Sequence, residues 1–113
     1  MKKSILFIFL IFSGKIAFSQ QKEIVKTDKA PMPIAPYSQA VKSNGFVFVA
    51  GQIGLNPADR KLVEGGVEAE TVQIMANIKA ILEASGAKLS DIVNTTIYIK
   101  DIGAFEIGRA HVW

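Results

Sequence analysis

The sequence predicts a small α+β domain in which one helix packs against an antiparallel sheet. Three observations carry this prediction: an apolar hairpin pattern around an Asn-Gly pair, an amphipathic run over residues 67–85 without proline or glycine, and alternating β-branched residues over 92–100. The chain has 113 residues, 50% of them hydrophobic, which bounds it to one domain. We find no internal repeat and no low-complexity linker.

The chain approaches the predicted hairpin through two unusual stretches. Residues 20–29 are polar with one apolar pair, Ile24-Val25, which predicts either a short leader strand or a loose arm. Residues 30–40 hold three prolines within six positions, and proline fixes φ and has no backbone donor. We therefore expect a stiff, extended segment that delivers Tyr37 to the start of a strand in a fixed direction.

The hairpin prediction rests on a turn signal between two apolar runs. Residues 39–42 alternate weakly, residues 43–45 (Ser-Asn-Gly) tolerate the positive φ of a tight turn, and residues 46–50 form the return strand. Because the return strand is apolar on both faces, we expect it to be covered on both sides or packed against a partner subunit. We expect Gly51 to end it where a side chain would be obstructive.

The helix is predicted over residues 67–85, between a Gly-Gly break at 65–66 and Gly86, a favourable residue after a helix C-terminus. Its apolar stripe, at helical spacing, consists of Thr71, Ile74, Met75, Ile78, Ile81 and Leu82. We interpret this stripe as core packing against the sheet. A further strand is predicted over residues 92–100 from their strict alternation.

The first 19 residues have the pattern of a secretory signal peptide. A lysine pair precedes a run of apolar residues, and Ala-Phe-Ser at 17–19 predicts cleavage before Gln20. The apolar run is about half the length that spans a bilayer, so we expect no stable membrane anchor. Removing residues 1–19 removes three lysines and no acids, and the formal net charge of +3 becomes 0. A neutral domain without a basic stripe predicts no nucleic-acid partner.

Several enzyme signatures are missing from the sequence. The chain has no cysteine, which excludes a cysteine nucleophile and a disulfide framework. His111 is the sole histidine, so a Ser-His-Asp triad is not expected, and no cluster has metal-ligand spacing. Tyr37 is either a half-buried anchor whose hydroxyl reaches a backbone carbonyl or a ligand contact. Gly51 is either a strand end or a close approach of backbone to ligand.

The chain resembles the Rid (YjgF-like) family of enamine/imine deaminases from about residue 24 to residue 105. The matching motifs are Thr-x-x-Ala-Pro at 27–31, Pro-Tyr-Ser-Gln-Ala at 36–40, Gly-Gln-Ile at 51–53, Asn-Pro at 56–57, Gly-Gly at 65–66, Asn-Ile-Lys-Ala at 77–80, and Val-x-Thr-Thr with Lys-Asp over 93–101. The resemblance implies a chorismate-mutase-like α+β fold and homotrimers with ligand pockets at the subunit interfaces. It also implies hydrolysis of reactive 2-aminoacrylate-type enamines or imines to 2-keto acids and ammonia, without cofactor or metal.

The resemblance also implies site residues. In the family, an arginine holds the substrate carboxylate and a glutamate positions the attacking water. Carried over to this chain, the expected substrate-binding residues are Tyr37, Ala50 and Gly51, with Ala50 standing where the family has a serine. Arg109 is not the family arginine, because its neighbours do not match, so the resemblance places no catalytic residue in this chain.

The family pattern ends after Phe105, before the expected second helix and last strands. We therefore expect residues 20–105 to be a partial Rid-like domain and hypothesise that residues 106–113 are a non-family tail arising from a sequencing adapter. A sheet cut short leaves an open edge, so we expect the 113-residue chain alone to be inactive. The residues leave two alternatives open: a non-catalytic Rid-like module that binds a small carboxylate or a protein, and a cytoplasmic location, usual for the family, in place of export.

Overall fold

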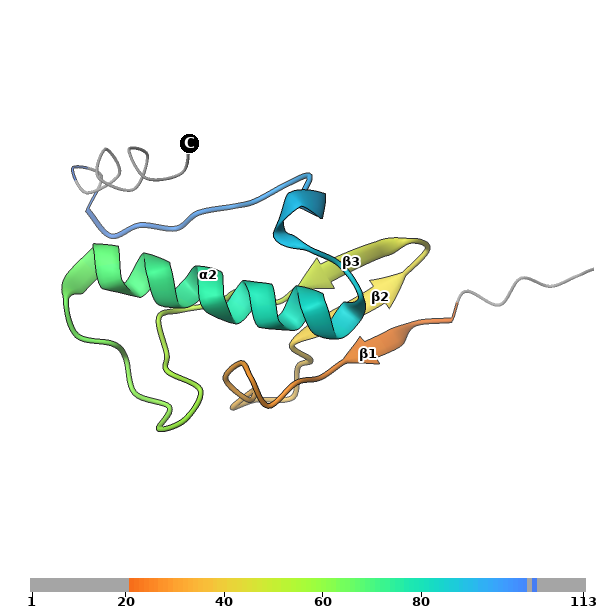
Figure 1. Ribbon diagram of the computed structural model, residues 1–113, viewed down its shortest axis with the longest axis horizontal. Coiled ribbons are helices and arrows are strands. Elements are labelled where there is room, and N and C mark those ends of the chain that lie inside the picture. Colours follow the sequence, from red (N-terminus) through yellow and green to blue (C-terminus); the bar gives the residue numbers. More distant parts are fainter. Residues whose placement is uncertain (1–20, 102, 104–113) are drawn as a thin grey trace, which may run out of the picture.

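A computed structural model of the chain describes residues 21–101 and residue 103. Within them, a three-stranded antiparallel sheet in the order β1-β2-β3 carries one long helix on one face (Figure 1). The elements are β1 (Glu23–Val25), β2 (Ala40–Ser43), β3 (Phe46–Val49), the helix α2 (Gly66–Ser85) and the short 3-10 helix η1 (Leu89–Asp91). The predicted α+β class is confirmed.

The β2–β3 hairpin forms where the turn signal predicted it. Asn44 and Gly45 have φ angles of 55° and 80°, and a two-residue hairpin turn needs such positive values. The leader segment forms a strand and not a loose arm, since β1 pairs with β2 in antiparallel register with Ile24 opposite Val41.

The core lies between α2 and one face of the sheet. Its buried members are Val25, Ala30, Ala40 and Ile81, with Val47, Val49 and Ala80 packed against them. Because side chains alternate along a strand, Phe46 and Phe48 lie on the opposite face and are 59% and 63% exposed. Within the described residues, β3 is therefore covered on one face only. As far as these residues extend, the expectation that the chain itself covers both faces of this strand is wrong.

The helix begins and ends at glycines. Gly65 precedes α2 in the left-handed region, and Gly86 follows it at φ 84°. The Gly86 N–H donates to the Glu83 carbonyl at 3.0 Å, and the Ala87 N–H donates to the Leu82 carbonyl at 2.9 Å. These two bonds form a Schellman motif, which satisfies carbonyls that the helix end leaves without partners. The prediction of a helix over residues 67–85 is confirmed to within one residue.

The predicted strand over residues 92–100 is wrong. After η1, this segment runs back along the length of α2 (Figure 1), but the described part of the chain contains no strand that pairs with it. Its apolar side chains are exposed, with Val93 at 86% and Tyr98 at 93%. Alternating β-branched residues favour an extended backbone. A β-strand also needs a neighbouring strand to hydrogen-bond with, and the alternation does not show that such a neighbour is present.

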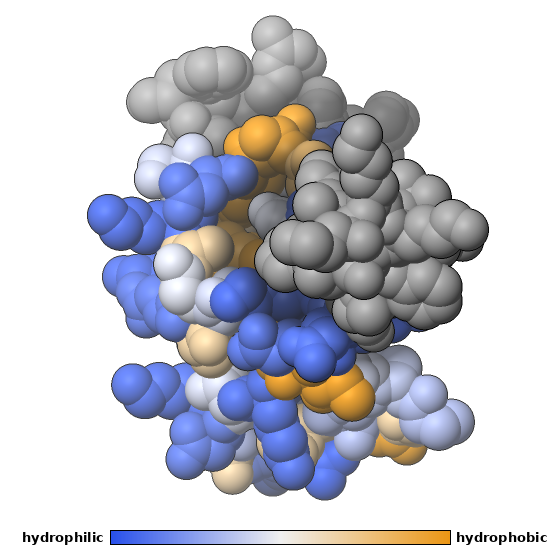
Figure 2. All heavy atoms as spheres, turned by 90° about the vertical axis from the view of Figure 1, so that its right-hand side faces the viewer, coloured by the Kyte–Doolittle hydropathy of each residue, from blue (hydrophilic) through white to orange (hydrophobic). Residues whose placement is uncertain are grey.

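Two predictions lie outside the described residues: the signal peptide over residues 1–19 and the non-family tail over residues 106–113. Among the residues that are described, no helix has the length and apolar character needed to cross a membrane. On the side of the molecule that Figure 2 shows, apolar side chains form separate patches among hydrophilic ones.

Candidate functional site

A small hollow of about 70 Å³ lies between two irregular segments, one that precedes the β2–β3 hairpin in sequence and one that follows it. One segment, residues 31–37, is called the proline wall below, and the other, residues 51–55, is called the loop wall. The lining includes Met32, Ile34 and Tyr37 from the proline wall and Gly51, Gln52 and Ile53 from the loop wall. The hollow is thus mostly apolar with a few polar groups, the usual composition of a small-molecule site.

The proline wall is held by one buried side chain, that of Gln39, which is 2% exposed. Its amide Nε2 donates to the carbonyls of Thr27 at 2.9 Å, Ala30 at 3.2 Å and Pro31 at 3.0 Å. Its Oε1 accepts from the Thr27 N–H at 2.7 Å. A segment with three prolines has few backbone donors of its own, so this carboxamide takes the place of strand pairing.

The loop wall is held from α2 by Asn77, which is 1% exposed. Its Nδ2 donates to the carbonyls of Ile53 at 3.3 Å and Leu55 at 3.0 Å. Its Oδ1 accepts from Gln73 Nε2 at 2.9 Å, which fixes the orientation of the Asn77 amide. The loop wall also lies close to the helix backbone at Gly54, where an added Cβ would be 2.8 Å from the Cα of Glu70.

Tyr37 stands between two hollows, since it also lines a wider one of about 300 Å³ on the β1 side of the proline wall. The ring is 49% exposed, and the backbone N–H donates to the Ala35 carbonyl at 2.7 Å. Within the described residues, no carbonyl accepts a hydrogen bond from the Tyr37 hydroxyl. The predicted role of Tyr37 as a ligand contact stays a prediction.

The structure brings Tyr37 and Gly51 together in one hollow, but Ala50 lies just behind the loop wall. The Ala50 N–H donates to the Gln39 carbonyl at 2.9 Å, and the Ala50 carbonyl accepts from Gln52 Nε2 at 3.1 Å. A role for Ala50 in ligand binding stays a prediction. The expectation that a side chain at Gly51 would be obstructive is wrong, because an added Cβ there meets nothing within 4 Å. Gly51 faces open space.

The hollow carries no charged side chain, and its polar groups are neutral. Within the described part of the chain, the backbone N–H groups of Gly51, Gln52 and Ile53 donate no hydrogen bond. No group of three His, Cys, Asp or Glu side chains in residues 21–101 and 103 is placed to hold a metal ion. The residues that line the hollow can therefore form hydrogen bonds with an anionic or carbonyl ligand, but they provide no positive charge to balance an anion.

Sequence reasoning missed Gln39 and Asn77 as residues that shape the site. Both residues belong to motifs that the chain shares with the Rid family, Gln39 at 36–40 and Asn77 at 77–80, but the motifs do not indicate what their side chains bond to. One feature of the sequence does point to Asn77. An asparagine amid the apolar positions of a core-facing helix must find partners if it is buried, and here it finds the loop wall.

Comparisons with known proteins place this geometry in context. A family model described as Endoribonuclease L-PSP matches residues 27–110. A RutC family protein of Pyrococcus abyssi is 50% identical over 84 residues, which make up 74% of this chain and 66% of that protein. A 2-iminobutanoate/2-iminopropanoate deaminase of Dermatophagoides farinae is 45% identical over 84 residues, again 74% of this chain and 66% of the relative. The chain thus spans about two thirds of the length of these curated relatives.

A solved structure agrees with the sequence comparisons. The crystal structure of a protein of unknown function of the conserved Rid protein family, YyfA from Yersinia pestis, superposes with a TM-score of 0.77 at 39% identity. The superposition covers 80% of this chain and 71% of that one. At this level of identity and superposition the two chains share a fold.

Proposed function

The chain belongs to the Rid family, and on this premise we propose that it supplies substrate-binding walls for the hydrolysis of small 2-imino acids to 2-keto acids and ammonia. The Dermatophagoides relative is named for 2-iminobutanoate and 2-iminopropanoate. The observation that carries the proposal is that Tyr37 and Gly51, far apart in sequence, line one hollow.

The proposed reaction needs no redox step. The oxygen of a water molecule bonds to the imine carbon of 2-iminobutanoate, and the carbon–nitrogen bond breaks, so that 2-oxobutanoate and ammonia are formed. The free N–H groups of the loop wall and the Tyr37 hydroxyl suit the polar end of such a substrate, because fixed donors stabilise developing negative charge. Met32, Ile34 and Ile53 suit a short alkyl chain.

The remaining parts of the site are also proposed. The family arginine for the carboxylate and the family glutamate for the water have no match among the described residues. A hollow of about 70 Å³ is well below the roughly 300 Å³ at which ligand pockets begin, so a further wall is needed to enclose a substrate. We propose that neighbouring subunits of a homotrimer supply it, which agrees with the exposed apolar face of the sheet at Phe46 and Phe48.

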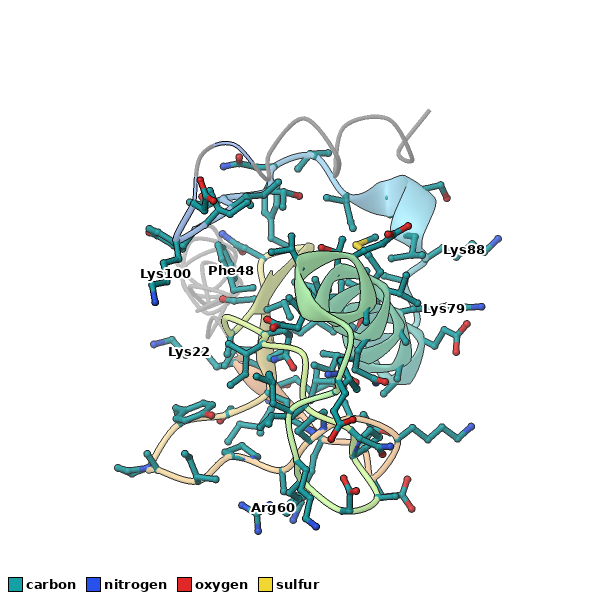
Figure 3. All side chains as sticks on the ribbon, turned by 90° about the vertical axis from the view of Figure 1, so that its left-hand side faces the viewer. Lys22, Phe48, Arg60, Lys79, Lys88 and Lys100 are labelled. Carbon is teal, nitrogen blue, oxygen red and sulfur yellow. The ribbon has the colours of Figure 1, made fainter. Side chains whose placement is uncertain are left out.

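An endoribonuclease activity, which the description of the family model names, receives no support from the surface charges. In Figure 3, Lys22 and Lys100 lie on one side of the molecule, Lys79 and Lys88 lie on the other, and Arg60 lies at the lower end. Tight binding of RNA relies on basic side chains gathered along one phosphate-binding face. These five cations are dispersed instead.

The proposal is tested with 2-iminobutanoate made in situ by an amino-acid oxidase acting on 2-aminobutanoate, under conditions in which the imine accumulates. Release of ammonia faster than in buffer on adding the full chain would support the proposal and overturn the expectation that this chain alone is inactive. Gly51→Val is expected to lower that rate by about tenfold or more, because its side chain enters the hollow without meeting protein atoms. Val72→Ala, at an exposed position on α2, serves as the control and should leave the rate unchanged.

Two results would contradict the deaminase proposal. If ammonia appears at the buffer rate while 2-oxobutanoate binds in a nuclear magnetic resonance titration, the chain is a binding module for small carboxylates. If neither release nor binding occurs, the hollow is not a site for this class of molecule.

A further inference from the structure

The two walls of the hollow have a feature in common: each is fastened to the fold by one buried carboxamide. Gln39, directly before β2, makes four hydrogen bonds to residues 27–31 at the start of the proline wall. Asn77, on α2, donates to two carbonyls of the loop wall. Both side chains are almost completely buried, although neither belongs to the apolar core cluster.

The two fastenings are also joined to each other. The backbone carbonyl of Gln39 accepts from the Ala50 N–H at 2.9 Å, next to the first residue of the loop wall. A directional backbone bond thus joins the residue that bonds to the start of the proline wall to the residue directly before the loop wall. Hydrogen bonds fix direction and distance more narrowly than apolar packing does.

We propose that Gln39 and Asn77 are positioning residues of the ligand site, which hold the proline wall and the loop wall at the separation that a 2-keto or 2-imino acid requires. This inference rests on the proposed function, whose site it deepens. Gln39 is among the residues that line the hollow, and its amide bonds to Thr27, Ala30 and Pro31. Asn77 does not line the hollow at all.

The orientation of the Asn77 amide is the sensitive point. Its two ends have different partners: Nδ2 faces carbonyls and Oδ1 faces the Gln73 amide at 2.9 Å. If the Gln73 donor is removed, the Asn77 amide loses one of its three hydrogen bonds, and only the carbonyls of Ile53 and Leu55 then hold its orientation. Gln73→Met thus loosens the loop wall through Asn77 without touching the loop wall itself.

The test compares Asn77→Leu and Gln73→Met in the full chain with Ile81→Val. Asn77→Leu keeps the number and branching of the side-chain heavy atoms and removes the amide donor and acceptor. Ile81 is fully buried on the same helix, and its core cluster contains no residue of either wall, so Ile81→Val is the control for loosening of the core. Affinity for 2-oxobutanoate is measured by resonance titration well below each melting temperature, so that every variant is folded.

We expect affinity to fall by about tenfold to a hundredfold in Asn77→Leu, less in Gln73→Met, and not at all in Ile81→Val, because small displacements of positioned groups have effects of this order. Gln39→Glu keeps the shape of its side chain but turns a donor into an acceptor that faces three carbonyls, and it is expected to behave like Asn77→Leu. If Asn77→Leu does not fold, the affinity of Gln73→Met for 2-oxobutanoate, compared with that of Ile81→Val, decides whether Asn77 is a positioning residue. If the positioning variants bind as well as Ile81→Val, the inference is overturned and the carboxamides only stabilise the fold.

The same samples separate this inference from the proposed function. If the unmodified chain binds no 2-oxobutanoate, the proposed function fails, and amide hydrogen exchange of Leu55 and Val63, whose N–H groups donate to the loop-wall carbonyls of Ile53 and Gly54, then decides the inference. Exchange that is faster in Gln73→Met than in Ile81→Val supports the positioning of the loop wall by Asn77. Equal exchange in the two variants overturns it.

Discussion

Two glycines of the loop wall, three residues apart, have opposite surroundings. A Cβ on Gly51 would stand in open space at the hollow. A Cβ on Gly54 would be 2.8 Å from the Glu70 Cα and 2.9 Å from its Cβ, and backbone at this distance cannot move aside. Gly54 is therefore required for the loop to lie against α2, whereas packing does not require glycine at position 51.

Gly54→Ala is expected to lower the free energy of unfolding by about 1–3 kcal/mol, the usual effect of inserting a methyl group into a packed contact. Gly51→Ala is the matched control and is expected to leave stability unchanged or raise it by less than about 1 kcal/mol, since it restricts only the unfolded chain. Urea unfolding of both variants measures the difference. Equal stabilities would show that the loop does not approach the helix as described.

At the scale of elements, α2 depends on how it ends. Gly86 adopts φ 84°, which lets two N–H groups reach the last carbonyls of the helix. Most side chains disfavour this conformation because Cβ crowds the carbonyl oxygen. The turn also directs the chain toward η1, where the Lys88 N–H donates to the Asp91 carboxylate at 2.8 Å.

Gly86→Ala is expected to destabilise the chain by about 1–2 kcal/mol, because an alanine must adopt the left-handed region or give up the motif. Gly86→Asn is expected to lose less, since asparagine tolerates that region better than alanine. Thermal unfolding followed by circular dichroism at 222 nm compares the two. A larger loss with asparagine than with alanine would contradict the backbone argument.

At the scale of the whole molecule, the sheet buries one face and exposes the other. Val47 and Val49 pack toward α2, while Phe46 and Phe48 lie on the open face with ring centroids 6.3 Å apart. In Figure 3, Phe48 lies on the same side as Lys22 and Lys100. An aromatic pair exposed on a sheet face is a typical feature of a surface that other protein covers.

If that face is buried between copies in a homotrimer, Phe48→Lys is expected to give a monomer in sedimentation velocity, with little change in the stability of each subunit. The reason is that a lysine ammonium is strongly disfavoured in a dry interface but well solvated on a monomer. Val72→Lys, at a similarly exposed apolar position on α2, is the control and should assemble as the unmodified chain does. An unchanged assembly of Phe48→Lys would place the interface elsewhere.

The sequence correctly predicted those parts of the fold that depend on the conformational preferences of a few neighbouring residues. Asn44-Gly45 specifies its turn because few other pairs accept positive φ at both positions, and Gly86 specifies the end of α2 for a similar reason. Ile81 and Leu82 were expected on the buried side of the helix and are buried there, whereas Met75 from the same stripe is 41% exposed. Residues 92–100 show the limit, since alternation alone does not provide a neighbouring strand.

The sequence by itself determined the α+β class, the hairpin, the helix and the family, because these depend on turn residues, periodicity and ordered motifs. It also selected Tyr37 and Gly51 for the site. Only the tertiary structure decided that these two residues share a hollow, that Gly51 faces open space, and that Gln39 and Asn77 fasten the walls. The physical reason is that a buried amide takes its role from partners up to 24 residues away in the sequence, and no local pattern states which carbonyls those are.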